Sequence, residues 1–573
     1  MESAVFQTNF STLDWIIAVI YLTGTVGLGI WVNRFVGSLA DFIVAGRGLR
    51  IYLAIATMTG TEIGLVTVMY NAQEGFQKGL SAYVIGVCWF IGLLVVGLTG
   101  FIIRRLRELE VMTIPEFYEK RYGVRSRVVG GAILALAGIL NMGLFLQAGA
   151  RFMTSVLGIG TGLGLKLLMT AMLLLVLLYT TLGGMVSVVI TDYVQFVVLG
   201  TGMIIATIWA VTHVGWGNIV HQVTAQYGAA GISPVAQGGY GWHYILWMIY
   251  MGIAAGSLWA TATARALSAR SPKVAQQLYA WSSITFLGRV VLPVTWGAAA
   301  LAYIAADPVL REAFLGAGPD KLSGQYAMPV FFAHILPSGL LGIIAAGMMA
   351  GFMSTHDSYL LCWASVITQD VVAPFFRVGP RGRAAGGLVA GIFGGMSLAA
   401  IVLGILRATG EVGWPGFLIA TLAGTAAAAW IAIRVTSLFE AADDLSERGR
   451  VILTRAIIVL IGLFLLIWGL WYEAPSTLWT YMAITGTIYL SGAFVCIAFG
   501  IYWKGANETG ALFALMAGLL AILGILPWKD WGVPWMTETN IAVVTILLAA
   551  VGIVVGSLLS SSKSAARPSQ EAS

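Results

Sequence analysis

A row of small and hydroxyl-bearing residues marks one face of the apolar stretch 343–372. Four of its members follow at spacings of three, one and three residues: Gly351, Ser354, Thr355 and Ser358. Such spacings place side chains on one face of a helix. Hard cations take oxygen ligands, so two adjacent hydroxyls and a glycine carbonyl one turn earlier could form half of a sodium site. In a second interpretation, Ser354 and Thr355 donate to carbonyls one turn back on their own helix.

Three carboxylates fall inside apolar stretches: Glu62, Asp192 and Asp357. A charged side chain is costly against lipid, so we expect each of them to face the interior of a helix bundle. Carboxylates in such a position hold cations or carry protons. A proton-coupled transporter that uses one of the three is therefore an alternative to a sodium-coupled one.

Two apolar stretches, 51–71 and 243–262, are interrupted by glycine and small polar residues. The first contains Gly60 and Gly64, and the second contains Gly256. Backbone leaves a helix at membrane depth only where protein or a water-filled cavity satisfies its polar groups, and paired interruptions point to a transporter's central site. The alternative is that these glycines only allow close helix packing.

The composition requires lipid as the solvent of these elements. Of 573 residues, 59% are hydrophobic and 10% are charged, and the mean hydropathy is +0.89. A spanning helix needs about 20 apolar residues, and by that measure the chain has about 15 candidates. They lie near 13–33, 51–71, 80–103, 128–150, 165–184, 187–212, 243–262, 279–305, 336–368, 384–407, 413–435, 454–472, 479–502, 508–527 and 540–560.

The basic residues predict the orientation, because positively charged loops stay in the cytoplasm. Most of the 31 Lys and Arg, Arg265 among them, fall in alternate connections, whereas the loop 213–242 has none. We therefore expect an inner-membrane protein with its N-terminus outside and its C-terminus cytoplasmic. The basic residues are scattered over short loops, which disfavours nucleic acid as a partner. The three cysteines form no metal or disulfide pattern.

Four sequence blocks together resemble the solute:sodium symporter family, whose members include bacterial proline, sialic acid and galactose transporters. They are VMTIPEFYEKRYG (111–123), GGMVSVVITDYVQ (183–195), the serine-rich stretch 343–372, and GIYWKGANETGA (500–511). The resemblance covers most of residues 13–527. It implies a sodium-coupled symporter of a small organic solute, with Na+ as coupling ion, rather than an enzyme.

The resemblance also implies an architecture: an all-α polytopic membrane protein with a LeuT-like five-plus-five inverted repeat and flanking helices. The corresponding division is a tail and peripheral helix in 1–50, repeats in 51–212 and 213–502, peripheral helices in 503–560, and a disordered tail in 561–573. A two-helix insertion near 371–450 departs from the family pattern. No output domain is visible, which disfavours a substrate-sensing membrane protein, and the sequence leaves the oligomeric state open.

By position, the family's sodium ligands become the carbonyls of Gly60 and Ile63 with groups of Gly351, Ser354 and Thr355. Some members bind a second cation, and the matching positions here are Asp192, Asp357 and Ser358. Glu62 corresponds to an aspartate of proline-transporting members and is expected to support sodium binding by its charge.

The predicted substrate contacts are Thr67, Gly256 and Met482. Sugar-transporting members carry two glutamines and a glutamate where this chain has Thr67, Met482 and Gly86. A buried sugar hydroxyl without a partner costs about 1–3 kcal/mol. The sequence therefore favours an organic acid or amino acid over a hexose.

Overall fold

The computed structural model describes residues 5–32, 47–318, 321–376, 447–471, 477–525 and 535–565. Over these ranges the chain is helical, and its only extended pairing is an isolated bridge between Leu49 and Ala269. The predicted all-α class is therefore confirmed. The insertion segments 384–407 and 413–435 lie outside the described residues.

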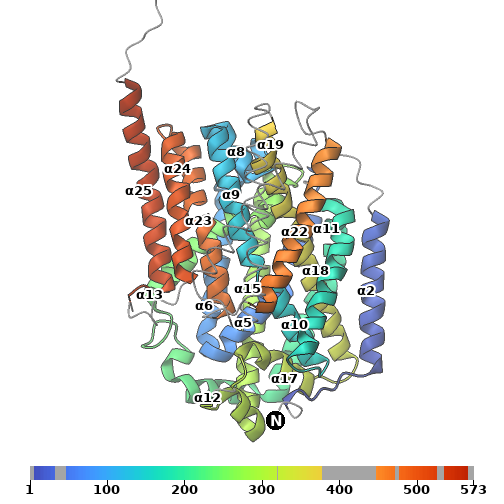
Figure 1. The fold of residues 1–573 in the computed structure, drawn as a ribbon. Helices are drawn as coiled ribbons and strands as arrows, with labels where there is room; N and C mark the ends of the chain where they lie inside the picture. Colours follow the sequence, from blue (N-terminus) through green and yellow to red (C-terminus); the bar gives the residue numbers. More distant parts are fainter. Residues whose placement is uncertain are drawn as a thin grey trace, which may run out of the picture.

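The long helices run side by side along one axis and form a bundle, with α2 and α25 at opposite edges (Figure 1). Those of the first part of the chain are α2 (Thr12–Val32), α4 (Ile51–Glu62), α5 (Leu65–Lys78), α6 (Tyr83–Thr99), α9 (Val124–Met142), α10 (Phe145–Val156) and α11 (Leu163–Val214). Those of the second part are α13 (Gly241–Leu258), α14 (Ala260–Leu267), α15 (Pro272–Ala306), α18 (Leu340–Val366), α22 (Glu447–Trp471), α23 (Leu478–Tyr502), α24 (Glu508–Gly518) and α25 (Glu538–Ala565).

Shorter helices cover the two ends of the bundle. One end, at the bottom of Figure 1, carries α12 (Trp216–Tyr227) and α17 (Ala327–Ile335) beside the N-terminus. The other end carries α8 (Ile114–Tyr122) and α19 (Ala373–Phe376), and the last residues of α25 also lie there.

The described helices that are long and apolar enough to cross a membrane number 7, or up to 8 when a bent pair counts as one span. Three shorter apolar helices add to them: Thr12–Thr25, Leu163–Leu178 and Glu508–Gly524. The stretches 165–184 and 187–212, predicted as two helices, are both covered by α11. A total of about 15 spanning helices stays a prediction.

Both predicted helix interruptions are present. Between α4 and α5, Ile63 and Gly64 leave the helical conformation, with ψ angles of 62° and 164°. Between α13 and α14 the chain bends by 44° at Trp259, whose ψ is 121°. The interruptions lie where small and polar residues break the apolar pattern.

Glycine also brings α5 against α15 at backbone contact. A Cβ built on Gly297 would lie 1.9 Å from the carbonyl oxygen of Ala72, and one on Gly75 would lie 2.2 Å from that of Val294. Gly75 and Gly297 therefore allow the close helix packing that the alternative interpretation assigned to glycine. It fixes α15, which carries Arg289, beside the broken α4–α5 pair.

Candidate functional site

The break after α4 leaves backbone carbonyls without their helical partners. The last four carbonyls of a helix have no intrahelical donor. Here the Glu62 carbonyl accepts from the Thr67 hydroxyl at 3.0 Å, and the Thr61 carbonyl accepts from the Thr355 hydroxyl at 3.2 Å. No hydrogen bond between described residues ends on the carbonyl oxygen of Gly60 or Ile63. These two are the carbonyls that the family pattern assigns to sodium.

Helix α18 meets this break with its small, hydroxyl-bearing face. A Cβ on Gly351 would lie 3.1 Å from the Ile63 carbonyl oxygen, and one on Gly64 would lie 1.9 Å from the Thr355 hydroxyl. Gly351 and Thr355, two of the α18 residues predicted for the sodium site, therefore lie against the break at Ile63 and Gly64. Their donors are carbonyls and hydroxyls, which fit a hard monovalent cation.

The hydroxyls of Ser354 and Thr355 do not bond back to their own helix. Ser354 donates to Asp192 on α11, and Thr355 donates to the carbonyl of Thr61 on α4. The alternative interpretation, in which both satisfy carbonyls one turn back, is therefore wrong for this structure. The two side chains instead tie α18 to α11 and to α4.

Asp192, the partner of Ser354, accepts hydrogen bonds from several side chains. One carboxylate oxygen accepts from the hydroxyls of Thr57 and Thr61 at 2.6 and 2.9 Å, and the other accepts from Ser354. The Arg265 guanidinium donates to Asp192 at 3.1 Å. Both side chains are buried, with 1% of Arg265 and none of Asp192 exposed.

The position of Arg265 corrects its assignment to a cytoplasmic connection. It lies on α14, the second half of the broken α13–α14 pair, inside the bundle. Its Nη2 also donates to the hydroxyls of Thr61 and Ser358, at 2.6 and 2.8 Å. A guanidinium therefore occupies the middle of the residues that the sequence assigns to a second cation.

Asp357 joins the same network indirectly. The Ser358 hydroxyl, which accepts from Arg265, donates to an Asp357 carboxylate oxygen at 3.2 Å. Asp357 is fully buried on α18. The two aspartates are thus linked through Ser358 and Arg265 rather than facing one another across an empty gap.

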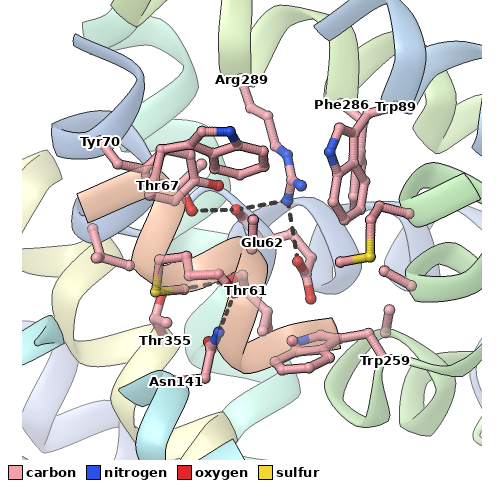
Figure 2. Close-up of a pocket in the computed structure, with 18 of the residues that line it drawn as sticks. Thr61, Glu62, Thr67, Tyr70, Trp89, Asn141, Trp259, Phe286, Arg289 and Thr355 are labelled. Atoms are coloured by element: carbon pink, nitrogen blue, oxygen red, sulfur yellow. Dashed lines mark hydrogen bonds and ion pairs between the residues drawn. The ribbon is translucent and has the colours of Figure 1, made fainter. Parts of the chain in front are cut away.

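A cavity of about 70 Å³ lies beside the break (Figure 2). Thr67, Gly256 and Met482, the predicted substrate contacts, all line it. Gly86 packs against Val290 instead and is not among the lining residues. The Asn141 side chain holds α9 to α23 through Met482 and Thr485, and its side-chain oxygen Oδ1 is buried with no hydrogen-bond partner among the described residues.

Glu62 and Arg289 form an ion pair in the cavity wall. Arg289 Nη1 lies 3.1 Å from Glu62 Oε2 and 3.1 Å from the Glu62 carbonyl oxygen, and the Thr261 hydroxyl donates to Glu62 Oε1 at 2.8 Å. The guanidinium carbon lies 3.9 Å from the Phe286 ring centre and 4.9 Å from that of Trp89. Figure 2 shows the pair reaching across from α15 to the broken helix.

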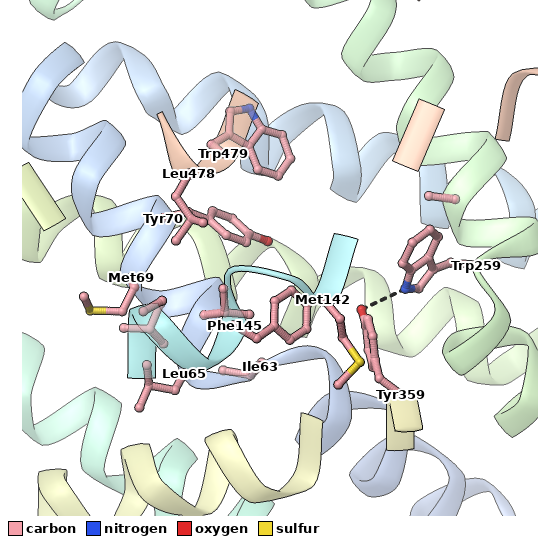
Figure 3. Packing of buried hydrophobic residues seen from close by; sticks show 14 of the residues in the cluster. Ile63, Leu65, Met69, Tyr70, Met142, Phe145, Trp259, Tyr359, Leu478 and Trp479 are labelled. Carbon is pink, nitrogen blue, oxygen red and sulfur yellow. Dashed lines mark hydrogen bonds between the residues drawn. The ribbon is translucent and has the colours of Figure 1, made fainter. Parts of the chain in front are cut away.

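Aromatic side chains line the cavity, and Figure 3 shows several of them. Tyr70 packs on Trp479 with ring centres 4.9 Å apart. On another side, Trp259 donates to the Tyr359 hydroxyl at 2.8 Å, and the Tyr359 ring packs against Phe145. The wall therefore combines a largely apolar surface with polar groups and one ion pair, and mostly apolar walls with placed polar groups are common in small-molecule sites.

A second cavity, of about 40 Å³, adjoins the Asp192 network. Arg265 and Ser358 form part of its wall, and Thr113, which precedes α8, lines it as well. Because α8 lies at the end of the bundle away from the N-terminus (Figure 1), this cavity lies between the network and that end.

Arg265 and Arg289 are two charged site residues that sequence reasoning missed. Arg265 follows the predicted span 243–262 by a few residues and looks like a loop cation. Arg289 stands alone inside the predicted span 279–305. A basic residue within a membrane span indicates a functional site in the interior of the bundle. The sequence therefore could have predicted a functional role for Arg289.

No group of three or more His, Cys, Asp or Glu side chains in the described part of the chain could hold a metal ion.

Comparison with protein families gives a match to the model described as "SSF: Sodium:solute symporter family" over residues 42–444. The chain is 24% identical to a sodium/glucose cotransporter of Vibrio parahaemolyticus over 393 residues, which cover 64% of this chain and 69% of that one. It is 26% identical to the osmoregulated proline transporter OpuE of Bacillus subtilis over 385 residues, covering 62% and 70%.

Among solved structures, the fold is similar to that of a Na+-coupled sialic acid symporter in a substrate-bound outward-open state. The TM-score is 0.70 at 16% sequence identity, and the match covers 96% of this chain and 98% of the other. At this identity the similarity concerns the fold.

Proposed function

The chain belongs to the sodium:solute symporter family, and on this premise we propose that it carries a small organic solute across the cell inner membrane with sodium bound at the α4–α5 break. Membership confirms the resemblance predicted from the four sequence blocks, and with it sodium-coupled symport and Na+ as coupling ion. The match covers residues 42–444, well over half of the chain.

The proposed sodium ligands are the carbonyls of Gly60, Ile63 and Gly351 and the hydroxyls of Ser354 and Thr355. The observation that carries this assignment is the meeting of two unused carbonyls with the hydroxyl face of α18. Sodium bound there links α4, α5 and α18, so it stabilises one arrangement of the broken helix over others.

At the position of a second cation, among Asp192, Asp357 and Ser358, we propose that Arg265 supplies the positive charge. Its guanidinium contacts Asp192 and Ser358 directly. A buried carboxylate needs a cation or a proton nearby, and a covalently attached cation meets that need without a second ion. One sodium per cycle is the resulting stoichiometry.

The transport cycle is proposed to be alternating access in a LeuT-like five-plus-five repeat, with the N-terminus outside and the C-terminus cytoplasmic. Broken helices that meet at the centre of the bundle support this architecture. One sodium crossing about 100 mV yields roughly 2.3 kcal/mol. A tenfold sodium gradient adds about 1.4 kcal/mol, so one ion sustains solute accumulation of several-hundred-fold, on the order of 10² to 10³.

The solute is proposed to be an organic acid or amino acid rather than a hexose, bound beside Thr67, Gly256 and Met482. The lining is largely apolar and aromatic, and of the three predicted contacts only Thr67 and Met482 stand where sugar-transporting members are expected to carry more polar residues. Proton coupling is the weaker alternative, because Glu62 and Asp192 are each ion-paired with an arginine.

The test is thermal stability of the purified chain in sodium, potassium and choline chloride at equal ionic strength. A ligand that binds only the folded state raises the Tm in proportion to its occupancy. We expect sodium to raise the Tm and potassium and choline to leave it low. Equal stability in all three salts contradicts the sodium site.

A further inference from the structure

An apolar crevice lies between α2 and the helices packed against it, outside the site already described. Its volume is about 200 Å³, and its wall is formed by α2, α10, α11, α18 and the residue Phe10 that precedes α2. Every side chain in that wall is apolar, and Ala18, Met153, Met172 and Met349 represent the four helices. We refer to this hollow as the α2 crevice.

The α2 crevice is unsuited to water. A buried water needs two to four polar partners, and the side chains of the wall offer only the indole nitrogen of Trp15. An engineered apolar cavity of about 150 Å³ stays dry and binds small apolar molecules instead. The α2 crevice is larger, and the atoms of its wall lack dispersion contacts unless an apolar group fills it. Its occupant is therefore apolar.

The α2 crevice opens on a side of the bundle that meets lipid. Helix α2 lies at the edge of the bundle (Figure 1), and Trp15 and Ala171 in the crevice wall are exposed. On the same two helices, Ile20, Leu167 and Leu174 are also exposed. The hydropathy of the chain requires lipid as the solvent of such surfaces. Acyl chains of the bilayer therefore reach the mouth of the crevice.

The aromatic end of the crevice indicates how a lipid enters it. The crevice follows α2 from Trp15 to Leu22, which is about 10 Å of helix. Phe10 packs edge-on against Trp15, with ring centres 5.4 Å apart. Tryptophan is typical of the boundary between acyl chains and head groups. A lipid whose head group lies at this boundary extends its chain along α2 into the crevice.

The size of the crevice excludes a helix as its occupant. A helix with its side chains is about 10–12 Å across, so a 10 Å length of it fills roughly 800–1,100 Å³. The volume of the crevice is about 200 Å³, a quarter of that or less. A helix of a second copy of the chain is therefore too thick, whereas a single acyl chain is narrow enough to enter.

Helix α18 separates the crevice from the proposed sodium ligands. With 3.6 residues per turn, Met349 in the crevice wall lies about 200° around the helix from Gly351. Ala345, one turn before Met349, also lines the crevice. A chain bound there packs against α18 on the side away from Ser354 and Thr355.

We propose that the α2 crevice binds one acyl chain of a membrane phospholipid. This lipid site is separate from the sodium site and from the cavity beside the α4–α5 break, and it stands whichever ion or solute the protein carries. The bound chain supplies the dispersion contacts that the wall lacks, so it is held more firmly than lipid on the exposed leucines nearby.

The test uses the purified full-length chain in nanodiscs of phosphatidylethanolamine and phosphatidylglycerol. A small fraction of the phospholipid carries a photoreactive diazirine in one acyl chain, and peptide mapping by mass spectrometry locates the labelled residues after illumination. We expect label on Met153, Met172 and Met349, which line the crevice and are buried from the surrounding bilayer. Label confined to exposed residues such as Leu167 and Leu174 overturns the proposal.

Three variants assign the label to the crevice. Ala18→Phe and Ala171→Phe each add an aromatic ring to its wall, and we expect at least fivefold less label on Met153 and Met349. Gly24→Phe is the matched control on α2, because Gly24 is exposed, a Cβ there would meet nothing within 4 Å, and Gly24 does not line the crevice. Its labelling should equal that of the wild type. Size-exclusion chromatography reports whether each variant folds, and if Ala18→Phe does not, Ala171→Phe on the exposed edge of the wall decides.

A parallel experiment separates the possible occupants. A free fatty acid with the same diazirine replaces the photoreactive phospholipid at the same mole fraction. Stronger labelling of the buried methionines by the free acid than by the phospholipid overturns the phospholipid as occupant. Equal labelling in the filled variants and the wild type overturns the crevice as the site. Cross-links between two copies of the chain at the crevice, without lipid label there, also overturn the proposal.

Discussion

Arg265 on α14 and Asp192 on α11 form an ion pair at 3.1 Å in the buried interior of the bundle. The same guanidinium nitrogen donates to hydroxyls on α4 and α18. One side chain from the second broken helix thus joins four helices at the point where the sodium-binding elements converge. A movement of α14 relative to α11 must therefore break or rearrange the ion pair between Arg265 and Asp192.

Replacing Arg265 by glutamine should make the protein bind one more sodium ion. The substitution leaves Asp192 charged and buried without a counter-ion, at a cost of about 3–5 kcal/mol in low sodium. A second sodium among Asp192, Ser358 and Asp357 offsets that cost. The slope of Tm against the logarithm of sodium concentration reports the number of ions bound. We expect this slope to be about twice that of the wild type.

The double variant Asp192→Asn with Arg265→Gln is the control for this prediction. It removes both charges, so no second ion is needed and the slope should return to the wild-type value. An unchanged slope in Arg265→Gln alone contradicts the role of Arg265 as a built-in cation.

Gly64→Ala should abolish sodium binding for a steric reason. A Cβ at this position would lie 1.9 Å from the Thr355 hydroxyl, so that hydroxyl must leave the α4–α5 break. We expect the sodium-dependent rise in Tm to be lost. Gly200→Ala on α11 is the control, since its Cβ would meet nothing within 4 Å. A normal sodium response in Gly64→Ala removes Thr355 from the site.

Much of the central fold follows from the sequence because it rests on local signals. Glycine and polar residues in 51–71 and 243–262 predict the two breaks, and both are present. Hydroxyl spacing predicts the face that α18 turns toward the first break. These signals work because backbone polar groups at membrane depth have few ways of being satisfied.

The ion pairs could not be predicted in the same way. Arg265 and Asp192 are 73 residues apart in sequence, and Arg289 and Glu62 are 227 apart. Their pairing depends on how α14 and α15 pack, which no local pattern specifies. The predicted end of the helix at residue 262 was also too early. Helix α14 extends to Leu267, so Arg265 lies on a helix and not in the expected loop.

Thr355→Val should raise the sodium concentration needed for half of the full thermal shift by about tenfold or more, which corresponds to about 1.4 kcal/mol. Valine keeps the shape of threonine and removes only the oxygen donor. Thr368→Val is the matched control. Thr368 is buried two residues after the end of α18, and its hydroxyl accepts a hydrogen bond from Thr454. Equal sodium requirements in the two variants contradict the assignment of Thr355 as a ligand.

Glu62→Gln tests whether the carboxylate in the break acts by its charge or by its hydrogen bonds. The glutamine amide oxygen can still accept from Arg289, and its amide nitrogen can donate to the Thr261 hydroxyl, so the geometry of the break should persist. The negative charge next to the proposed sodium ligands is lost, and at about 4 Å such a charge is worth roughly 4 kcal/mol at an effective dielectric near 20. Because Arg289 screens part of that attraction, we expect the sodium midpoint to rise by about tenfold to a hundredfold, or about 1.4–2.8 kcal/mol.

The matched control is Glu74→Gln on α5. Glu74 is also buried and accepts a hydrogen bond from Tyr240 at 2.6 Å, but it does not line the central cavity. Its sodium midpoint should stay near that of the wild type. If Glu62→Gln behaves like Glu74→Gln, the Glu62 carboxylate only holds the broken helix to Arg289 and Thr261. A higher midpoint in Glu62→Gln alone, with an unchanged Tm in choline chloride, identifies its charge as the source of sodium affinity.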